Sequence, residues 1–441
     1  MLVKFKVSNF LSFKNEAVLS LVPSREKQHI KHHIYSSANK SFTNLLRTGV
    51  IYGANASGKS NFIRAIEFAQ KFVVRGSSPK RTIGNISFKL DNESTNLPTC
   101  FYFELQIKNK SYSYEFKILR DVVVFEELKE IKATVTQLIF RRVVNDEESS
   151  EFTFGKELKS LKKDEYQFIN FLSEGTRNNQ LFITESVERN SKHFQMIYDW
   201  FDDYVRVFTP RSISHGVEFR IGNDKDFSTF LKQTLSEFDP SVVEISTKFL
   251  DADSSDIPIR ILDEINDEIS EDGAVFISNP STGNRSVVLK SDGVLKLLKI
   301  CTQHLSVDGK NKVTFDLEEE SDGTRRIIEL APLFYELMNT TNAVVAFVDE
   351  LDRSLHPKLT KHLIELFLKK STGDNSQLIV STHDSDLLDQ SILRRDEIWL
   401  IDKKNGLSEL KSLSKEFSPR HDKDIRSEYL KGNYGAVPHF V

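Results

Sequence analysis

A glycine-rich stretch stands between a short apolar run and a helix-like pattern near the start of the chain. The apolar run covers 49–52 and the helix-like pattern covers 61–66. A strand that turns through glycines into a helix points backbone N–H groups and the positive helix end at one small volume. The stretch therefore predicts a Walker A loop for the phosphates of a nucleoside triphosphate. Its residues are Gly53, Ala54, Asn55, Ala56, Ser57, Gly58, Lys59 and Ser60.

The last residues of this loop carry side chains that can act on phosphate and metal. We expect Lys59 to reach the β- and γ-phosphates and the Ser60 hydroxyl to ligate Mg²⁺. Asn61 follows directly in the sequence, and we include it in the nucleotide-binding segment.

Two acidic residues follow a second apolar run far along the chain. The run 344–348 reads as a buried parallel strand and ends in Asp349 and Glu350. On a strand adjacent to the Walker strand, Asp349 would hold the Mg²⁺ shell and Glu350 would polarise the attacking water. The alternative is a solvated strand end, which is the usual explanation for such a pair alone. The Walker A loop favours the catalytic interpretation.

A third apolar run, 377–382, ends in His383. At the sheet edge where the γ-phosphate is expected, an imidazole can donate to that phosphate and sense its loss. A histidine at a strand end is more often structural, but this location favours the switch role. We therefore expect Lys59, Glu350 and His383 to be the catalytic residues.

Ser321, Asp322 and Gly323 open an amphipathic helix that contains Pro332. A serine and a glycine at a helix N-terminus can donate to an anion. Because Lys59 already serves one phosphate cradle, we expect this helix end to contact a second nucleotide, bound by another copy of the chain. The alternative is a serine N-cap with nothing to bind.

Composition limits the classes of protein that remain. Hydrophobic residues make up 39% and charged residues 28% of the 441 positions, which is ordinary for a soluble globular protein. The apolar run 343–348 is far too short to span a membrane. Cys100 and Cys301 are the only cysteines, so a disulfide framework is excluded and a reducing cytoplasm fits. The net charge of -4 gives no global positive field for nucleic acid, although a local basic groove stays possible.

The pattern along the chain predicts an α/β protein whose nucleotide core is assembled from both ends of the sequence. We expect strands at 2–7, 10–14 and 397–401, the last of these closing the core sheet. An antiparallel meander is expected over 99–144 and helices over 156–203.

Three domain segments follow from this reading. Residues 1–145 form the first part of the head with its β lobe, and 146–300 form a helical or mixed middle insertion. Residues 301–441 complete the head. Asp251 and Asp253 resemble a metal-binding pair, but a solvated acidic loop is the better explanation.

The order of these motifs resembles that of ABC-type ATPase heads of the SMC/RecF-like group. More narrowly, the chain is similar to AAA-family ATPases of bacterial abortive-infection and anti-phage systems, the RloA type and its relatives in PARIS and Septu. Two further stretches are similar to that subgroup, 10–13 and 429–438. The resemblance covers about 1–120 and 311–441, and the middle of the chain carries none. No glutamine can be assigned to the usual Q-loop.

The resemblance implies a P-loop NTPase head of ABC type, with a mixed sheet, flanking helices and an antiparallel β lobe. It implies ATP and Mg²⁺ as ligands and a homodimer, or a higher homo-oligomer, with two ATP molecules between the heads. It assigns residues to each ATP from both chains: Lys59, Ser60, Asp349, Glu350 and His383 in cis, Ser321 and Gly323 in trans, and Asp352 at the dimer seam.

Two functions stay open from the sequence. The first is a cytoplasmic defence ATPase that senses phage and controls a separate effector protein, nuclease or toprim-like, because no nuclease motif follows His383. The alternative is a RecF- or SMC-like ATPase that clamps DNA, supported locally by basic residues. A transporter subunit and a ring-forming AAA+ protein are less favoured. The basic residues are Lys156, Lys159, Lys162, Lys163, Arg394 and Arg395.

Overall fold

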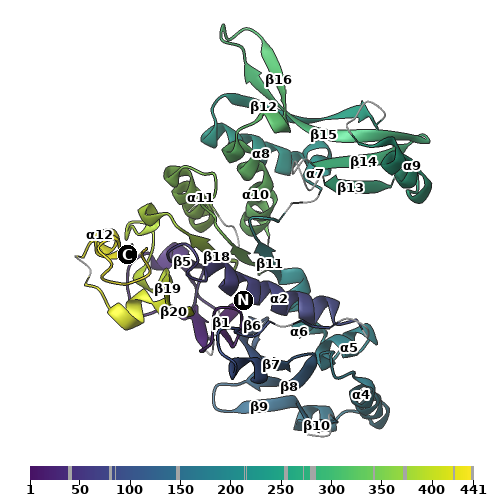
Figure 1. Cartoon of the computed structure of the whole chain (residues 1–441), viewed down its shortest axis with the longest axis vertical. Helices are drawn as coiled ribbons and strands as arrows, with labels where there is room; N and C mark the ends of the chain where they lie inside the picture. Colours follow the sequence, from purple (N-terminus) through teal and green to yellow (C-terminus); the bar gives the residue numbers. More distant parts are fainter. Residues whose placement is uncertain are drawn as a thin grey trace. The chain divides into compact units, whose positions relative to one another are not determined.

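Figure 1 shows the computed structural model of the chain. The structure describes residues 1–441 except 38–41, 79–81, 85, 146–148, 213, 215, 253–256, 272, 279–284, 341–342, 371–374, 421–422 and 439–441. The chain divides into two compact units. The first contains Met1–Pro210, Leu337–Asp352 and Thr360–Val441, and the second contains Arg211–Glu336 and Arg353–Leu359.

These units differ from the segments that we expected from the sequence. Residues after 145 continue into the first unit because aromatic side chains join them to the antiparallel sheet. The ring of Phe140 lies 5.0 Å from that of Phe182 and 5.3 Å from that of Phe194. The expected helices are present over this stretch, as α3 (Lys156–Lys159), α4 (Lys163–Gly175), α5 (Phe182–Glu188) and α6 (Gln195–Asp199).

A six-stranded sheet forms the core of the first unit, and its strands come from three parts of the chain. Five strands run parallel, and β20 closes one edge antiparallel to β19. Each of the central strands is fully buried, as their apolar sequences predict. The order is β11 (Val205–Phe208), β17 (Val345–Val348), β18 (Gln377–Thr382), β5 (Thr48–Tyr52), β19 (Ile398–Lys404) and β20 (Leu407–Ser412).

Three sequence expectations about this sheet were wrong. β19 is not the last strand, because Asn405 and Gly406 adopt positive φ values of 51° and 82° and turn the chain into β20. β11 was not foreseen at all. The Walker strand β5 and the acid-bearing strand β17 are not adjacent, since β18 lies between them.

A second, seven-stranded sheet of the first unit packs against helix α2 (Lys59–Arg75). The sheet is antiparallel throughout, with the order β10 (Ser150–Phe154), β9 (Thr136–Val144), β8 (Val122–Ile131), β7 (Lys110–Leu119), β6 (Thr99–Ile107), β1 (Leu2–Ser8) and β2 (Ala17–Ser20). The meander expected over 99–144 is therefore confirmed. The expected strand 10–14 is instead a tight turn with one bridge between Phe10 and Phe13.

Aromatic rings fill the space between α2 and this sheet. The ring of Phe62 lies 5.4 Å from that of Phe5, and the ring of Phe68 lies 5.4 Å from that of Phe101. Phe62, Ile66 and Ala69 recur at three- and four-residue spacing and are all buried. The helix that begins at the glycine-rich loop is thus fixed along its length by core packing.

The second unit is built on an antiparallel sheet with the order β12 (Val242–Asp251), β15 (Val294–Leu305), β14 (Arg285–Ser291) and β13 (Ala274–Ser278). A further strand, β16 (Lys312–Asp316), pairs with β15. Helices α7 (Val217–Asn223) and α8 (Lys225–Phe238) contact β12, and α10 (Asp322–Asn339) begins in this unit.

Helix α9 (Ile259–Glu268) covers part of the same sheet. Its buried Leu262 and Ile265 pack with Val288 and Leu297, while its acidic residues are exposed, as expected for that run. Asp251 is exposed, and Asp253, the other half of the suspected metal pair, lies outside the described residues. None of the helices in the described part of the chain has the length and apolar character that a membrane crossing requires.

Candidate functional site

The glycine-rich loop lies at the carboxyl end of β5, with Gly53–Ser57 in the turn and Gly58 as the N-cap of α2. Gly58 has φ 122°, and a Cβ there would lie 2.4 Å from Ser408 Oγ. A Cβ on Gly53 would lie 2.5 Å from the carbonyl oxygen of Ile401. Both positions thus require glycine for close backbone approach. Ser60 and Asn61 occupy the first turn of the helix, and Asn55 and Ala56 are exposed.

Two serines from distant parts of the chain hold this loop in place. Ser408 Oγ donates to Ser57 O at 2.5 Å, and it lies 2.9 Å from Ser12 Oγ, whose own proton it can accept. Asn61 Nδ2 also donates to Ser12 Oγ at 2.9 Å. Neither serine was predicted from the sequence. Asn405 followed by glycine is a hairpin signal that would have predicted β20, the strand that carries Ser408.

Lys59 is buried at the centre of the site, with 4% of its surface exposed. Its Nζ donates to Gly53 O at 2.7 Å and to Ala54 O at 3.2 Å, and it lies 3.3 Å from Nδ1 of His383. Burial lowers the pKa of the Lys59 ammonium to about 8, and the nearby carboxylates, led by Asp349, oppose that shift. Desolvation and then the charge of Lys59 lower the pKa of His383.

The predicted acids lie beside this lysine, and Ser381 holds them. Ser381 Oγ donates to Asp349 Oδ1 at 2.5 Å and accepts the Glu350 amide at 2.9 Å. Glu350 has φ 51°, a conformation that side chains with a Cβ seldom adopt. Ser381 therefore connects the acid-bearing strand to the strand that ends in His383. This link was not foreseen, and it explains how β18 can separate β5 from β17 without dispersing the site.

Asp352 accepts a hydrogen bond from the His383 amide at 3.1 Å. In this structure Asp352 thus positions His383 of its own chain. Its Oδ1 atom is buried and has no hydrogen-bond partner among the described residues. The contact expected at a dimer seam stays a prediction.

The side chains brought together here fit a magnesium triphosphate. Lys59 is a buried cation that faces a glycine cradle too tight for Cβ atoms. Asp349 is 3% exposed and held in one orientation, and hard oxygen ligands such as its carboxylate and the Ser60 hydroxyl suit Mg²⁺. We expect Ser60 and Asp349 to hold the metal.

The C-terminal segment packs beside this site. Helix α12 (Ile425–Leu430) places the ring of Tyr429 6.0 Å from that of Tyr52, which ends β5. Tyr429 Oη donates to Ala436 O at 3.1 Å, and Arg426 pairs with Asp386 in the turn after His383. The stretch 429–438, singled out only for its similarity, thus supports the strand that leads into the glycine-rich loop.

The predicted signature lies in the second unit, at the start of α10. Ser321 Oγ accepts the Thr324 amide at 3.1 Å, which is N-cap geometry, and Thr324 Oγ1 donates to Asp239 Oδ2 at 3.3 Å. A Cβ on Gly323 would lie 3.0 Å from Ser354 O. The serine cap that we considered as an alternative is therefore present, and the contact with a second nucleotide stays a prediction.

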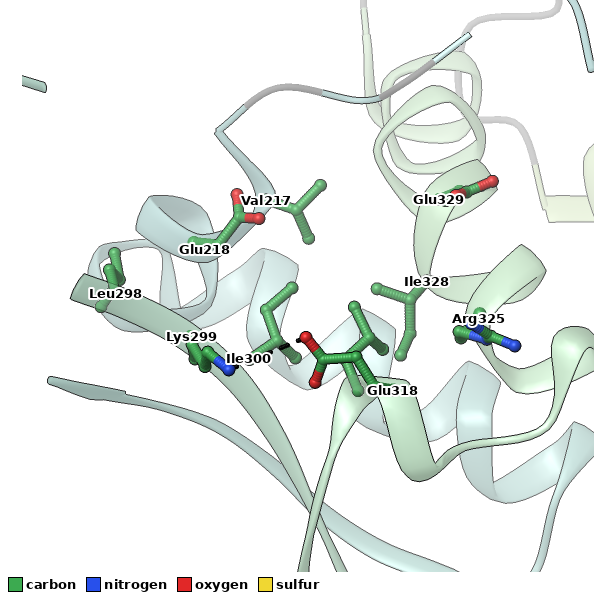
Figure 2. A pocket seen from close by; sticks show the side chains of 10 residues that line it. Val217, Glu218, Leu298, Lys299, Ile300, Glu318, Arg325, Ile328 and Glu329 are labelled. Carbon is green, nitrogen blue, oxygen red and sulfur yellow. Dashed lines mark ion pairs between the residues drawn. The ribbon is translucent and has the colours of Figure 1, made fainter. Parts of the chain in front are cut away.

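Figure 2 shows a pocket of about 100 Å³ beside the first turns of this helix, where Ile328 points toward strand β15 and the charged ends of Arg325 and Glu329 point away from it. Its floor is apolar, and Lys299 Nζ pairs with Glu318 Oε1 at 3.7 Å across one side. Arg325 and Glu329 also pair with neighbours on their own helix, Asp322 and Arg326, so we assign this pocket no ligand.

Arg394 is wrongly placed among the candidate DNA contacts. Its side chain is fully buried and donates to Asp396 through Nε at 2.9 Å and Nη2 at 2.7 Å. Arg395 is largely buried and donates to Glu26 Oε2 at 3.4 Å. The four lysines between 156 and 163 are exposed.

Comparisons with known proteins agree with this architecture. A family model described as "AAA domain, putative AbiEii toxin, Type IV TA system" matches residues 50–389. No curated protein matches the chain. The strand order, the glycine-rich loop and the separate antiparallel sheet make the first unit an α/β P-loop NTPase head of ABC type.

Several SMC head structures are similar over most of their length. One, bound to the C-winged helix domain of ScpA, shares 15% identity over 95% of this chain and 98% of its own, with a TM-score of 0.37. The SMC head domain from Thermotoga maritima shares 13% sequence identity over 93% of this chain and 98% of its own, with a TM-score of 0.35. The third is an Smc head domain with an extended coiled coil, bound to the C-terminal domain of ScpA derived from Pyrococcus furiosus. It shares 14% sequence identity over 98% of this chain and 99% of its own, with a TM-score of 0.35.

We predict that ATP binding near pH 8.5 takes up a proton. The free Lys59 ammonium has a lowered pKa, so part of the population is neutral there, and a triphosphate favours the charged form. Calorimetry in buffers of different ionisation enthalpy measures the uptake. Lys59→Arg is the control because arginine stays charged at this pH. Equal uptake by both proteins would contradict the assignment.

A second prediction concerns the tight approach at the loop. Gly58→Ala should weaken ATP binding at least about tenfold, since a strained φ costs on the order of 1–3 kcal/mol and the new Cβ meets Ser408. Gly175→Ala is the matched control, because nothing lies within 4 Å of a Cβ there. Nucleotide titration measures the ATP affinity of each variant, and urea unfolding measures its stability. Unchanged affinity in Gly58→Ala would show that the loop does not carry the ligand.

Proposed function

The chain belongs to the AAA-domain family whose model matches residues 50–389, and we propose that it is an ATPase whose heads pair around two ATP molecules. One observation carries the proposal. Lys59, Asp349, Glu350 and His383 come from three strand ends and meet at one glycine-rich loop. Phosphoryl transfer to water needs such a cradle, a metal ligand and a group that orients water.

Each residue then has a distinct role toward the triphosphate. Lys59 neutralises charge on the β- and γ-phosphates, and Glu350 orients and polarises the attacking water. Bound Mg²⁺, held by Ser60 and Asp349, supplies further charge neutralisation. His383 lies against Lys59, which supports its proposed role of donating to the γ-phosphate and responding to the departure of that phosphate.

The pairing of two heads is supported by the start of α10. The first turn of a helix has amide groups without intrahelical partners, and Gly323 adds no side chain that would cover them. We propose that Ser321 and Gly323 contact the nucleotide bound to the other copy. Asp352 joins His383 to the loop after Glu350, so a contact at that loop reaches the switch residue.

For the biological role we propose a sensor or regulator in bacterial abortive infection. The family description names the AbiEii toxin and type IV toxin–antitoxin systems, which supports a defence role. In this role a phage component changes ATP turnover, and the toxic reaction belongs to a separate effector, nuclease or toprim-like. A cytoplasmic location fits this role. Phage plating with the intact operon tests it, since loss of ATP binding through Lys59→Ala should abolish protection.

The second candidate is DNA clamping by paired heads. The exposed lysines of α3 and α4 favour it locally, although such residues are common on solvated surfaces. Duplex binding that is stimulated by ATP and falls steeply with salt would support it.

Glu350→Gln should keep ATP binding and lower turnover by about 10²–10⁴-fold, because the amide cannot take up a proton from water. It should also trap an ATP-bound pair of heads, seen by light scattering. The control is Glu365→Gln on α11 (Pro357–Lys370), where the carboxylate pairs with Lys369. Full ATPase activity in Glu350→Gln would refute the role.

Ser321→Asp should abolish ATP-dependent pairing while each chain still binds nucleotide. Aspartate caps a helix as well as serine does, so α10 stays folded, but its charge repels a phosphate. Ser321→Thr keeps a neutral capping hydroxyl and serves as the control. Size-exclusion chromatography with ATP measures pairing, and an undiminished pair in Ser321→Asp would count against the trans contact.

A further inference from the structure

Strand β16 of the second unit uses only one of its two edges. It lies beside β15 in a hairpin (Figure 1). In this hairpin Leu305 faces Lys312 and Cys301 faces Asp316. Among the described residues, no strand pairs with its other edge. A strand edge of this kind offers backbone groups to any chain that can lie beside it.

The hairpin geometry fixes which amides point to that edge. Ser306 N donates to Asn311 O at 2.8 Å and closes the turn. Hydrogen-bonded and non-bonded pairs alternate from there, so Val313 and Phe315 bond to β15 while Lys312 and Thr314 point outward. Asp316 also points outward, and its amide donates to Glu319 Oε2 at 2.8 Å.

The side chains of β16 are complementary to those of a second copy of β16 that runs antiparallel to it. When two copies are aligned antiparallel about Thr314, Lys312 faces the second copy's Asp316. In the same register Val313 faces Phe315, and Thr314 faces Thr314. Every charge meets the opposite charge and every apolar side chain meets an apolar one, which are the cross-strand pairs that stabilise sheets. The outward amides of Lys312 and Thr314 fall opposite outward carbonyls in this register.

The surroundings of the strand fit the same arrangement. Lys312 Nζ already pairs with Glu244 Oε2 at 2.5 Å, and Asp316 Oδ1 pairs with Lys248 Nζ at 2.5 Å. Positive and negative side chains therefore alternate across the sheet. Lys312 and Val313 are 53% and 46% exposed. Exposed apolar residues also flank the strand, at Leu305 on β15 and at Val307 in the turn.

We propose that β16 is a homotypic docking edge, through which two copies of the chain join their second-unit sheets by antiparallel pairing about Thr314. Such a contact is isologous and closes on itself. It needs no nucleotide, and it is separate from the proposed pairing of heads around ATP. A chain with both contacts can form assemblies larger than a pair.

Disulfide trapping without nucleotide and with EDTA tests this register. In Thr314→Cys the two new thiols face each other, within the Cα separation of about 4.4–6.8 Å that a disulfide needs. We expect at least ten times more linked dimer than in Val294→Cys, which is also an exposed position of this sheet, on β15. Val313→Cys should not link, because position 313 faces 315. The unsubstituted chain controls for Cys100 and Cys301.

A proline variant tests the backbone contact. Thr314→Pro removes an outward N–H and leaves the bonds to β15 intact. We expect it to abolish nucleotide-free dimers in analytical ultracentrifugation and to leave ATP binding unchanged. Linking of Val313→Cys as efficient as that of Thr314→Cys, or no linking above the Val294→Cys control, would overturn the proposal and show β16 to be a charge-protected edge. These outcomes for β16 do not bear on the proposed pairing of heads, which is measured separately in the presence of ATP.

Discussion

The buried ammonium of Lys59 is the constraint on which the first unit depends. Removing a charge from water is unfavourable unless opposite charges and hydrogen bonds surround it. Backbone carbonyls of the loop accept hydrogen bonds from this ammonium, and the carboxylates of Asp349, Asp352 and Glu350 favour its charged form. The sheet must therefore bring strand ends from distant parts of the chain to one point, and the same arrangement suits a triphosphate.

Short hydroxyl side chains also fix that arrangement. Ser381 joins the acid-bearing strand to the histidine-bearing strand, and Ser408 joins the loop to Ser12 near the N-terminus. Each bond connects segments far apart in the sequence, and all but the part-buried bond from the Glu350 amide are buried, where a hydrogen bond is costly to lose. Asp352 joins His383 to the segment that follows Glu350, so in the proposed mechanism a change at His383 on nucleotide binding would reach that segment.

The sequence could predict the elements whose signals are local. The glycine-rich loop, the two acids and His383 each follow a buried apolar strand, and the structure brings them together. Long-range features carried no comparable signal. The insertion of β18 between β5 and β17 depends on strand order, and the burial of Arg394 depends on an aspartate that a basic run does not reveal. Strand β20 could have been predicted, because Asn405 followed by Gly406 is a sequence signal for a hairpin.

Direct binding of ATP tests the central claim. Equilibrium dialysis with a labelled, slowly hydrolysed ATP analogue should find one site per chain, strengthened by Mg²⁺. In Asp349→Asn the effect of Mg²⁺ should largely disappear while binding without metal persists, because the carboxylate is the expected metal ligand. Absence of binding, or equal dependence on Mg²⁺ in both proteins, would contradict the account.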